Sequence, residues 1–333
     1  MKNPVLILGG TGVVGSQTAK ILRRLHPELP LALGGRDLRK ADALAREIGG
    51  PVEGVAVDLG RRDLGLPPEK RFSAVAMFLK DETFHALRYA QEQGAAYLSI
   101  STGTFEMAPE VALYAQKPAR APILMASQWL VGAVVLPALL FARAFRKLDT
   151  IELAAHLDEE DMGGPAASAD FDRMTTVGAN ALILARGKWI SAGGDNAKRR
   201  LLDVDGVELE ASAYSPFDVL SLAAATQAHS IRFDLAVGKT ASRRRGEPFS
   251  TEIVIEMSGE LADGTAGRVR HDLVHPAGQA PVTALGVAVG VEHLIGLAGA
   301  AVGPGLYLPE VLIEPEYMVR RLKEFGMQFR SSK

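Results

Sequence analysis

The chain has 333 residues, of which 47% are hydrophobic and 23% charged, and its formal net charge is −2. This balance is typical of a soluble globular protein of about two domains and argues against disordered and fibrous classes. A near-neutral chain lacks the basic footprint of a general nucleic-acid binder, so we predict no nucleic-acid partner. The absence of cysteine excludes disulfides, thiolate metal sites and cysteine nucleophiles, and it is compatible with a cytoplasmic location.

We expect neither a signal peptide nor a membrane segment. The apolar run at residues 5–8 is too short for a signal peptide. Residues 121–142 carry no charge, and this stretch of 22 residues is long enough to span a membrane. Ser127 and Gln128 interrupt this run and Pro137 lies in its second half, so we interpret it as a buried strand followed by a helix.

Residues 4–130 alternate short apolar runs with amphipathic stretches. The predicted strands are residues 5–8, 31–33, 52–57, 74–79, 96–101 and 122–126. The predicted helices are a first helix that follows Gly15 and runs to about residue 25, and residues 38–48, 84–93 and 110–116. Apolar strands that alternate with amphipathic helices indicate a parallel sheet covered on both faces. The right-handed crossover rule then favours an α/β fold with a doubly wound sheet.

A glycine cluster separates the first predicted strand from the first helix. It comprises Gly9, Gly10, Thr11, Gly12, Val13, Val14 and Gly15. Glycine allows the sharp turn and the close approach of a pyrophosphate to the backbone amides at the helix start. A glycine-rich turn in this position predicts dinucleotide binding by these seven residues.

The end of the second predicted strand bears on the choice of cofactor. NAD sites usually carry an acid there, whereas this chain has Gly34, Gly35 and Arg36, followed by Arg39. Glycine leaves room and guanidinium suits a phosphate, so we favour NADP over NAD. Asp37 is the counter-evidence, although it is also suited to cap the following helix.

Three further strand ends lie on the same predicted sheet edge. Asp58 is positioned either to reach the adenine amine or to stabilise a turn. Leu79 and Ser101 are further predicted cofactor contacts, and Lys80 would protonate or orient a substrate. A surface lysine at a helix start is the alternative for Lys80.

From about residue 148 the pattern changes to a period of two, which predicts an antiparallel sheet with one buried and one polar face. We predict helices over residues 169–186 and 216–228, followed by helices over 282–298 and 315–325. This divides the chain into a dinucleotide-binding domain (1–130), an α+β substrate or dimerisation domain (148–280) and helices that return to the first domain (281–333).

The second half contains candidate site residues as well. His156 and Asp158 share one face of a predicted strand, where a neighbouring carboxylate would suit the imidazole to acid–base catalysis. A structural surface histidine is the alternative. Gly163 and Gly164 precede a helix start at Pro165, and free amides there would hold a substrate carboxylate. An ordinary glycine-rich loop explains them equally well.

No metal site is predicted. His271 and His275 share one strand face, but we interpret them as partly buried core residues because no third ligand is evident. We interpret the run of arginines at residues 243–245, near Gly246, as a solvated turn.

The chain resembles the saccharopine dehydrogenase-like reductases. The resemblance rests on the glycine cluster and on the stretches at residues 34–45, 94–101 and 305–310. It implies an NAD(P)-binding Rossmann domain, an inserted α+β domain and a homodimer. It also implies reduction of a C=N or a related double bond.

We therefore expect an NADP-dependent oxidoreductase that transfers hydride to a C=N or C=C bond of a small, carboxylate-bearing substrate. A non-catalytic NADP(H) sensor on the same fold is the alternative. A structural homodimer that uses the polar sheet face is a third hypothesis.

Overall fold

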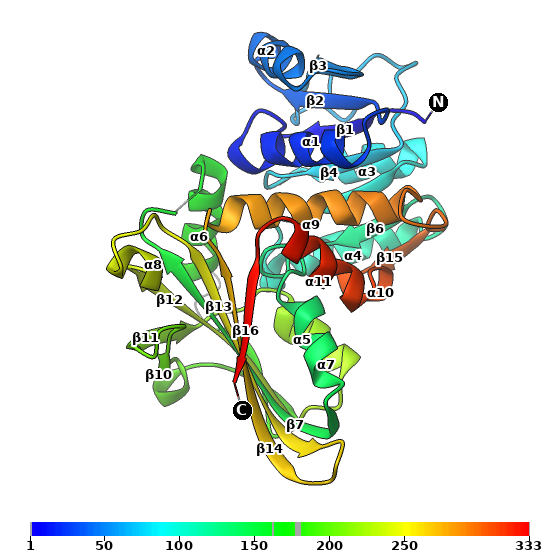
Figure 1. Cartoon of the computed structure of the whole chain (residues 1–333). Coiled ribbons are helices and arrows are strands. Elements are labelled where there is room, and N and C mark those ends of the chain that lie inside the picture. Colours follow the sequence, from blue (N-terminus) through cyan, green and yellow to red (C-terminus); the bar gives the residue numbers. More distant parts are fainter. Residues whose placement is uncertain (1, 162, 177–180, 333) are drawn as a thin grey trace. The chain divides into compact units, whose positions relative to one another are not determined.

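The computed structural model describes residues 2–161, 163–176 and 181–332. The chain divides into two compact units, whose elements are labelled in Figure 1. The first unit contains Met1–Ser127, Gly164–Ala166 and Thr283–Ile313, and the second contains Gln128–Gly163, Ala167–Val282 and Glu314–Lys333.

The first unit is built on a seven-stranded parallel sheet with the order β15-β6-β5-β4-β1-β2-β3. Its strands are β1 (Val5–Leu8), β2 (Leu31–Gly35), β3 (Val52–Ala56), β4 (Ala74–Met77), β5 (Ala96–Ser99), β6 (Pro122–Met125) and β15 (Gly305–Tyr307). All residues of β1, β4, β5 and β6 are buried, which explains their uninterrupted apolar sequences. The strand order reverses between β1 and β4, as the doubly wound fold class predicted, and ligands bind at this point in such sheets.

Short helices connect these strands. They are α1 (Val13–Leu25), α2 (Leu38–Ile48), α3 (His85–Gln93) and α4 (Met107–Gln116). Residues of the later helix α9 (Gln279–Leu294) lie against α1, because Thr18 Oγ1 donates to the Ala284 carbonyl at 3.3 Å. His26, directly after α1, has its Nε2 2.6 Å from Oε1 of the buried Glu292 in α9. A return of this late helix to the first unit was predicted.

The second unit contains a large mixed sheet (Figure 1). Its main path runs β10-β11-β12-β7-β13-β14-β16, with β8 and β9 off this path. The bounds are β7 (Phe145–Asp158), β8 (Leu182–Ala185), β9 (Lys188–Ser191), β10 (Lys198–Leu202), β11 (Glu208–Ala213), β12 (Ser230–Gly238), β13 (Thr251–Leu261), β14 (Ala266–His275) and β16 (Gln328–Ser332). The helices are α5 (Val135–Ala142), α6 (Pro165–Thr176), α7 (Asp218–Ala225), α8 (Ala241–Arg244) and α11 (Pro315–Glu324), and the short helix α10 (Pro309–Leu312) belongs to the first unit.

The prediction of an antiparallel sheet is wrong for one central pair. Strands β7 and β12 are parallel, with Ile151 opposite Ile231, whereas β7 and β13 are antiparallel. A long connection with helices separates β7 from β12, and such a crossover permits parallel pairing. Alternation with a period of two reports which faces are buried and carries no information on strand direction.

The predicted helix over residues 169–186 is also wrong at its carboxyl end. Residues 182–185 form strand β8, which pairs with β9 in a hairpin. Arg186 and Gly187 connect the two strands with φ angles of 49° and 76°. A two-residue turn with positive φ at both positions is favoured by the twist of β-hairpins. Residues 177–180, which belong to this predicted helix, lie outside the described part of the chain.

The last fifty residues, for which only helices were predicted, add two strands. Strand β15 extends the first sheet beside β6, and β16 pairs with β14 in the second sheet. The charge-free stretch folds as strand β6 and helix α5. Among the described residues no helix is both long and apolar enough to cross a membrane.

Candidate functional site: the carboxyl edge of the first sheet

The glycine cluster forms a tight turn between β1 and α1. Gly9 has a φ of +88°, and the Gly12 amide donates to the Gly9 carbonyl at 2.9 Å. Gly12 precedes α1 without any side-chain cap, so the first amides of the helix are open to a ligand. Thr11, Gly12 and Val13 are exposed. This turn offers uncapped amides and a helix N-terminus, as a pyrophosphate site requires.

Two of the glycines are required by close packing. A Cβ atom added to Gly15 would lie 2.4 Å from the Gly9 carbonyl oxygen. A Cβ atom added to Gly10 would lie 2.9 Å from the Ile7 oxygen and 3.1 Å from Leu33 Cα. A side chain at Gly15 would therefore push α1 away from the turn, and one at Gly10 would collide with β1 and β2. With glycine at both positions the turn stays tight and its backbone stays accessible to a dinucleotide.

The end of β2 lies next to this turn. A Cβ atom added to Gly35 would be 3.6 Å from Thr11 Oγ1. Arg36 and Arg39 are exposed and form no ion pair within the described residues. Asp37 caps α2, because its Oδ1 accepts hydrogen bonds from the amides of Arg39 at 3.0 Å and Lys40 at 3.3 Å. The capping alternative for Asp37 is thereby confirmed.

Asp58 follows β3 and stabilises a turn. Its Oδ1 accepts a hydrogen bond from the Gly60 amide at 2.9 Å, and its backbone amide donates to the Leu64 carbonyl at 3.0 Å. The turn alternative is therefore observed, and an adenine contact by this exposed carboxylate stays a prediction.

Leu79 and Lys80 follow β4, the strand next to β1. A Cβ atom added to Gly9 would lie 3.3 Å from Leu79 Cγ, so Leu79 borders the glycine turn. Lys80 is mostly buried and forms an ion pair with Glu106 at 3.0 Å. The carboxylate of Glu106 also accepts a hydrogen bond from the Gly103 amide at 2.9 Å. The lysine is thus held at the strand end near the predicted cofactor and is not a freely solvated side chain.

Sequence reasoning missed Glu110, which lies in the same polar cluster. It is 4% exposed, and its Oε1 accepts hydrogen bonds from Thr102 Oγ1 at 2.9 Å and Ser99 Oγ at 3.3 Å. Its Oε2 has no hydrogen-bond partner in the described part of the chain. Burial raises the pKa of Glu110, although the two hydroxyl groups and the charge of Lys80 oppose this shift. The sequence offered one sign of this buried acid, because Glu110 is the only charged residue of the segment that forms α4.

The ends of β5 and β6 complete this edge. Ser101 is buried after β5, and the Thr102 amide donates to Ser127 Oγ at 3.1 Å. The structure therefore brings together, along one sheet edge, most of the residues predicted in the first half. These are Gly9, Gly10, Thr11, Gly12, Val13, Val14, Gly15, Gly35, Leu79, Lys80 and Ser101.

His156 and Asp158 lie in the second unit, on β7. Asp158 is fully buried and accepts hydrogen bonds from Thr240, from the Glu160 amide and from Arg243. Burial opposes its ionisation, but these hydrogen bonds prevail and lower its pKa to about 2. These contacts hold the carboxylate against the surrounding loops. His156 is 5% exposed, so it is not the surface histidine of the alternative, and the catalytic role of His156 and Asp158 stays a prediction.

The arginine run at residues 243–245 is not the solvated turn that was predicted. It belongs to helix α8 and the residue after it, and each guanidinium pairs with a carboxylate. Arg243 pairs with Asp158, Arg244 with Asp203 and Arg245 with Asp205. These ion pairs fix the loops around the end of β7.

Helix α6 begins at Pro165, four residues before the predicted start at residue 169, and follows Gly163 with a φ of +69°. Substrate binding by Gly163 and Gly164 stays a prediction. His271 and His275 are half-buried and buried, respectively, and burial lowers the pKa of each. This agrees with their interpretation as core residues.

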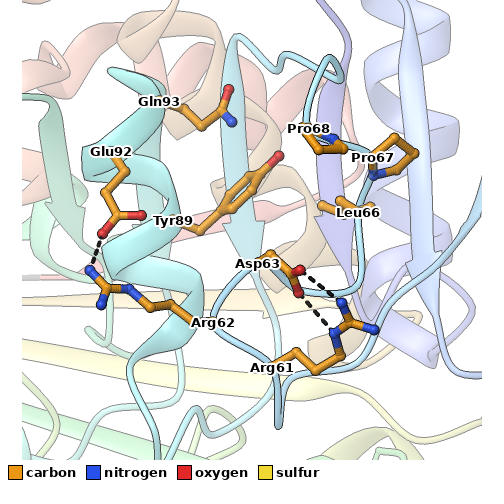
Figure 2. A pocket seen from close by; sticks show the side chains of 9 residues that line it. All are labelled: Arg61, Arg62, Asp63, Leu66, Pro67, Pro68, Tyr89, Glu92 and Gln93. Carbon is orange, nitrogen blue, oxygen red and sulfur yellow. Dashed lines mark hydrogen bonds and ion pairs between the residues drawn. The ribbon is translucent and has the colours of Figure 1, made fainter.

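A hollow of about 580 Å³ lies beside α3 in the first unit. Figure 2 shows the side chains that line it. Its charges are paired, Arg61 with Asp63 and Arg62 with Glu92. The hydroxyl of Tyr89 is buried without a hydrogen-bond partner. None of the predicted site residues lines this hollow, and its paired charges leave it no net preference for an ion.

A solved structure matches this protein over the whole chain, whereas comparisons of sequence find no match. No protein-family model and no curated protein sequence matches significantly. Apo saccharopine dehydrogenase (L-Glu forming) from Saccharomyces cerevisiae superposes with a TM-score of 0.72, covers 100% of both chains and is 13% identical. A short-chain dehydrogenase from Sphingobium yanoikuyae in complex with NADPH covers 37% of this chain and 71% of its own, with 19% identity and a TM-score of 0.26. The chain therefore has the saccharopine dehydrogenase-like fold, with a Rossmann sheet and a second, mixed sheet.

Proposed function

We propose that the protein is an NADP-dependent oxidoreductase that reduces a C=N or C=C bond of a small, carboxylate-bearing substrate. The observation that carries the cofactor proposal is the glycine turn with its uncapped helix N-terminus beside Arg36, which is exposed and forms no ion pair in the described part of the chain. The shared fold with saccharopine dehydrogenase supports the reaction class.

The residues of the first unit suit the pyrophosphate of a dinucleotide and the 2′-phosphate on its adenosine ribose. The open amides of the turn and of α1 would bind the pyrophosphate, and Arg36 would bind a 2′-phosphate. Asp37 would not repel that phosphate strongly, because its carboxylate is turned to the amides of α2. When bound, reduced NADP supplies the hydride.

Lys80 would hold or deliver a proton near the reacting carbon. It lies at the end of β4, directly after a residue that borders the glycine turn. Its ion pair with Glu106 limits the positions of its ammonium group, and this would orient it toward a substrate. Glu110 in the same cluster would hold a proton and pass it to Lys80, since burial raises its pKa.

A titration with NADPH and NADH tests the cofactor proposal. We expect the wild type to bind NADPH more tightly than NADH, and Arg36→Ala to lose about tenfold in NADPH affinity, a change typical of one charge-assisted contact. NADH affinity should stay unchanged. Arg46→Ala is the matched control, because Arg46 is an exposed arginine of α2, the helix that follows Arg36. Equal affinities in the wild type, or an unaffected Arg36→Ala, would overturn the assignment of NADP.

The alternative function is a non-catalytic NADP(H) sensor. It predicts the same binding but no NADPH oxidation with any member of a panel of amine and keto-acid pairs, cyclic imines and enoyl acids. Oxidation with any of these substrates would favour the reductase.

A further inference from the structure

Three side chains with metal-ligating chemistry meet in the second unit, and none of them belongs to the proposed cofactor site in the first unit. His156 lies in β7 and Glu252 lies directly opposite it in β13, in the register that pairs these strands. Asp203 follows β10. One ligand atom from each of the three residues lies within 4.8 Å of the others. We propose that His156, Glu252 and Asp203 form a binding site for a divalent transition metal of the zinc type.

The first argument is that two of the ligand atoms are buried without hydrogen-bond partners. His156 is 5% and Glu252 1% exposed. Among the residues that the structure describes, His156 Nδ1 and Glu252 Oε2 have no hydrogen-bond partner, and they face each other at 3.5 Å. Leaving a buried polar atom unsatisfied costs about 1–3 kcal/mol, so a pair of them in contact indicates a missing partner.

The second argument is that both carboxylates are held by their other oxygen atoms. Glu252 Oε1 accepts hydrogen bonds from the Ala241 amide and Ser250 Oγ, each at 2.8 Å. Asp203 Oδ1 accepts from the amides of Asp205 and Val207, each at 2.9 Å. Metal ligands are commonly oriented in this way by a surrounding layer of hydrogen bonds.

The third argument is charge. Arg244 pairs with Asp203, but within the described residues Glu252 has no ion-pair partner other than His156. A buried carboxylate without a cation is strongly disfavoured. A divalent cation would neutralise Glu252 and share Asp203 with Arg244.

The donor set determines the class of metal. One imidazole nitrogen and two carboxylate oxygens suit zinc, cobalt or manganese, whereas calcium and magnesium prefer oxygen atoms alone. Ligand atoms around zinc lie about 2.0–2.2 Å from the ion, so the three side chains would move closer together upon binding. Three protein ligands leave a fourth position for water, and the ion would connect β7, β13 and the end of β10.

Titration of the chelator-treated full chain with Co²⁺ tests this proposal. We expect one ion to bind per chain with visible absorption bands of a four- or five-coordinate site, and Zn²⁺ to displace it. Glu252→Gln should weaken Co²⁺ binding by at least about tenfold, while its amide oxygen keeps the hydrogen bonds from Ala241 and Ser250. His156→Gln should also weaken it. Glu256→Gln, on the same strand, and His229→Gln, an exposed histidine, should bind as the wild type does.

Several outcomes would overturn the proposal. The absence of one-to-one Co²⁺ binding by the wild type would leave a plain His156–Glu252 ion pair as the explanation. Unchanged affinity in both Glu252→Gln and His156→Gln would place the metal elsewhere. If His156→Gln does not fold, Glu252→Gln decides alone, with NADPH binding and circular dichroism as the measures of its fold. As a second readout, Zn²⁺ but not Mg²⁺ should raise the thermal unfolding temperature of the wild type, and Zn²⁺ should leave that of Glu252→Gln unchanged.

Discussion

At the scale of single residues, the glycine turn and Lys80 connect the fold to the proposed chemistry. Gly15 allows α1 to begin against the Gly9 carbonyl, and this contact leaves the helix amides open. Lys80 lies at the neighbouring strand end in an ion pair with Glu106. The sequence alone predicted both residues, because each belongs to a local pattern of strand, turn and helix. Glu110 was not predicted, since its burial depends on contacts with residues around β5.

Gly15→Ala should abolish cofactor binding. Its Cβ atom would lie 2.4 Å from the Gly9 oxygen, so the turn or the helix start must shift by several tenths of an ångström. We expect at least a hundredfold loss of NADPH affinity in a fluorescence titration, about 2.7 kcal/mol. Gly299→Ala is the control, because a Cβ atom there meets no atom within 4 Å. Tight NADPH binding by Gly15→Ala would show that the ligand does not use this turn.

Lys80→Met should separate catalysis from cofactor binding. Methionine keeps the apolar part of the side chain but removes the proton donor. We expect kcat for the reduced substrate to fall by about 10²–10⁴-fold while NADPH affinity stays within about twofold. The control is Lys117→Met, which removes a more exposed lysine after α4. An unchanged kcat would remove Lys80 from the reaction.

At the scale of elements, the first sheet was predicted closely and the second only in part. Predicted and observed bounds of α2 are identical, because the capping aspartate and the apolar spacing are both local. Strand β8 was missed because its apolar residues continue a helical pattern, and only its pairing with β9 and β12 selects the strand. Local sequence signals therefore suffice for helices with caps, whereas strands off the main path of a sheet depend on their partners.

Asp37→Ala should destabilise α2 without affecting the cofactor. The carboxylate accepts hydrogen bonds from two amides at the helix start, and loss of such a cap costs about 1 kcal/mol. Urea unfolding measures this loss, and Asp37→Asn should retain most of the stability because asparagine also caps helices. NADPH affinity should remain as in the wild type. A large drop in NADH or NADPH affinity in either variant would identify Asp37 as a ribose ligand.

At the scale of the whole molecule, buried acids link global stability to pH. Burial raises the pKa of Asp161 to about 6, although the Gln279 amide, which donates to its Oδ2 at 2.7 Å, opposes this shift. The unfolded chain loses this proton near pH 4, while the folded chain keeps it until about pH 6. The folded state therefore binds more protons in this interval, and stability falls as the pH rises from about 4 to 6.

Asp161→Asn should remove this part of the pH dependence. We expect the free energy of unfolding of the wild type, relative to that of the variant, to decrease by about 1–2 kcal/mol between pH 4 and 6, after allowance for solvent screening. Urea unfolding at four pH values across this interval measures the difference. Asp195→Asn, at an exposed aspartate, should follow the wild type. Parallel curves for Asp161→Asn and the wild type would contradict the raised pKa.

The sequence by itself determined the doubly wound sheet, its glycine turn and the cap of α2, because each depends on residues adjacent in the chain. Only the tertiary structure decided the parallel pairing of β7 with β12, the burial of Glu110 and the meeting of His156 with Glu252 and Asp203. His156 and Glu252 are 96 positions apart in the sequence, and strand register alone brings them opposite each other. Local patterns encode the conformation of short segments, whereas contacts between distant segments follow from the burial and pairing of the whole chain.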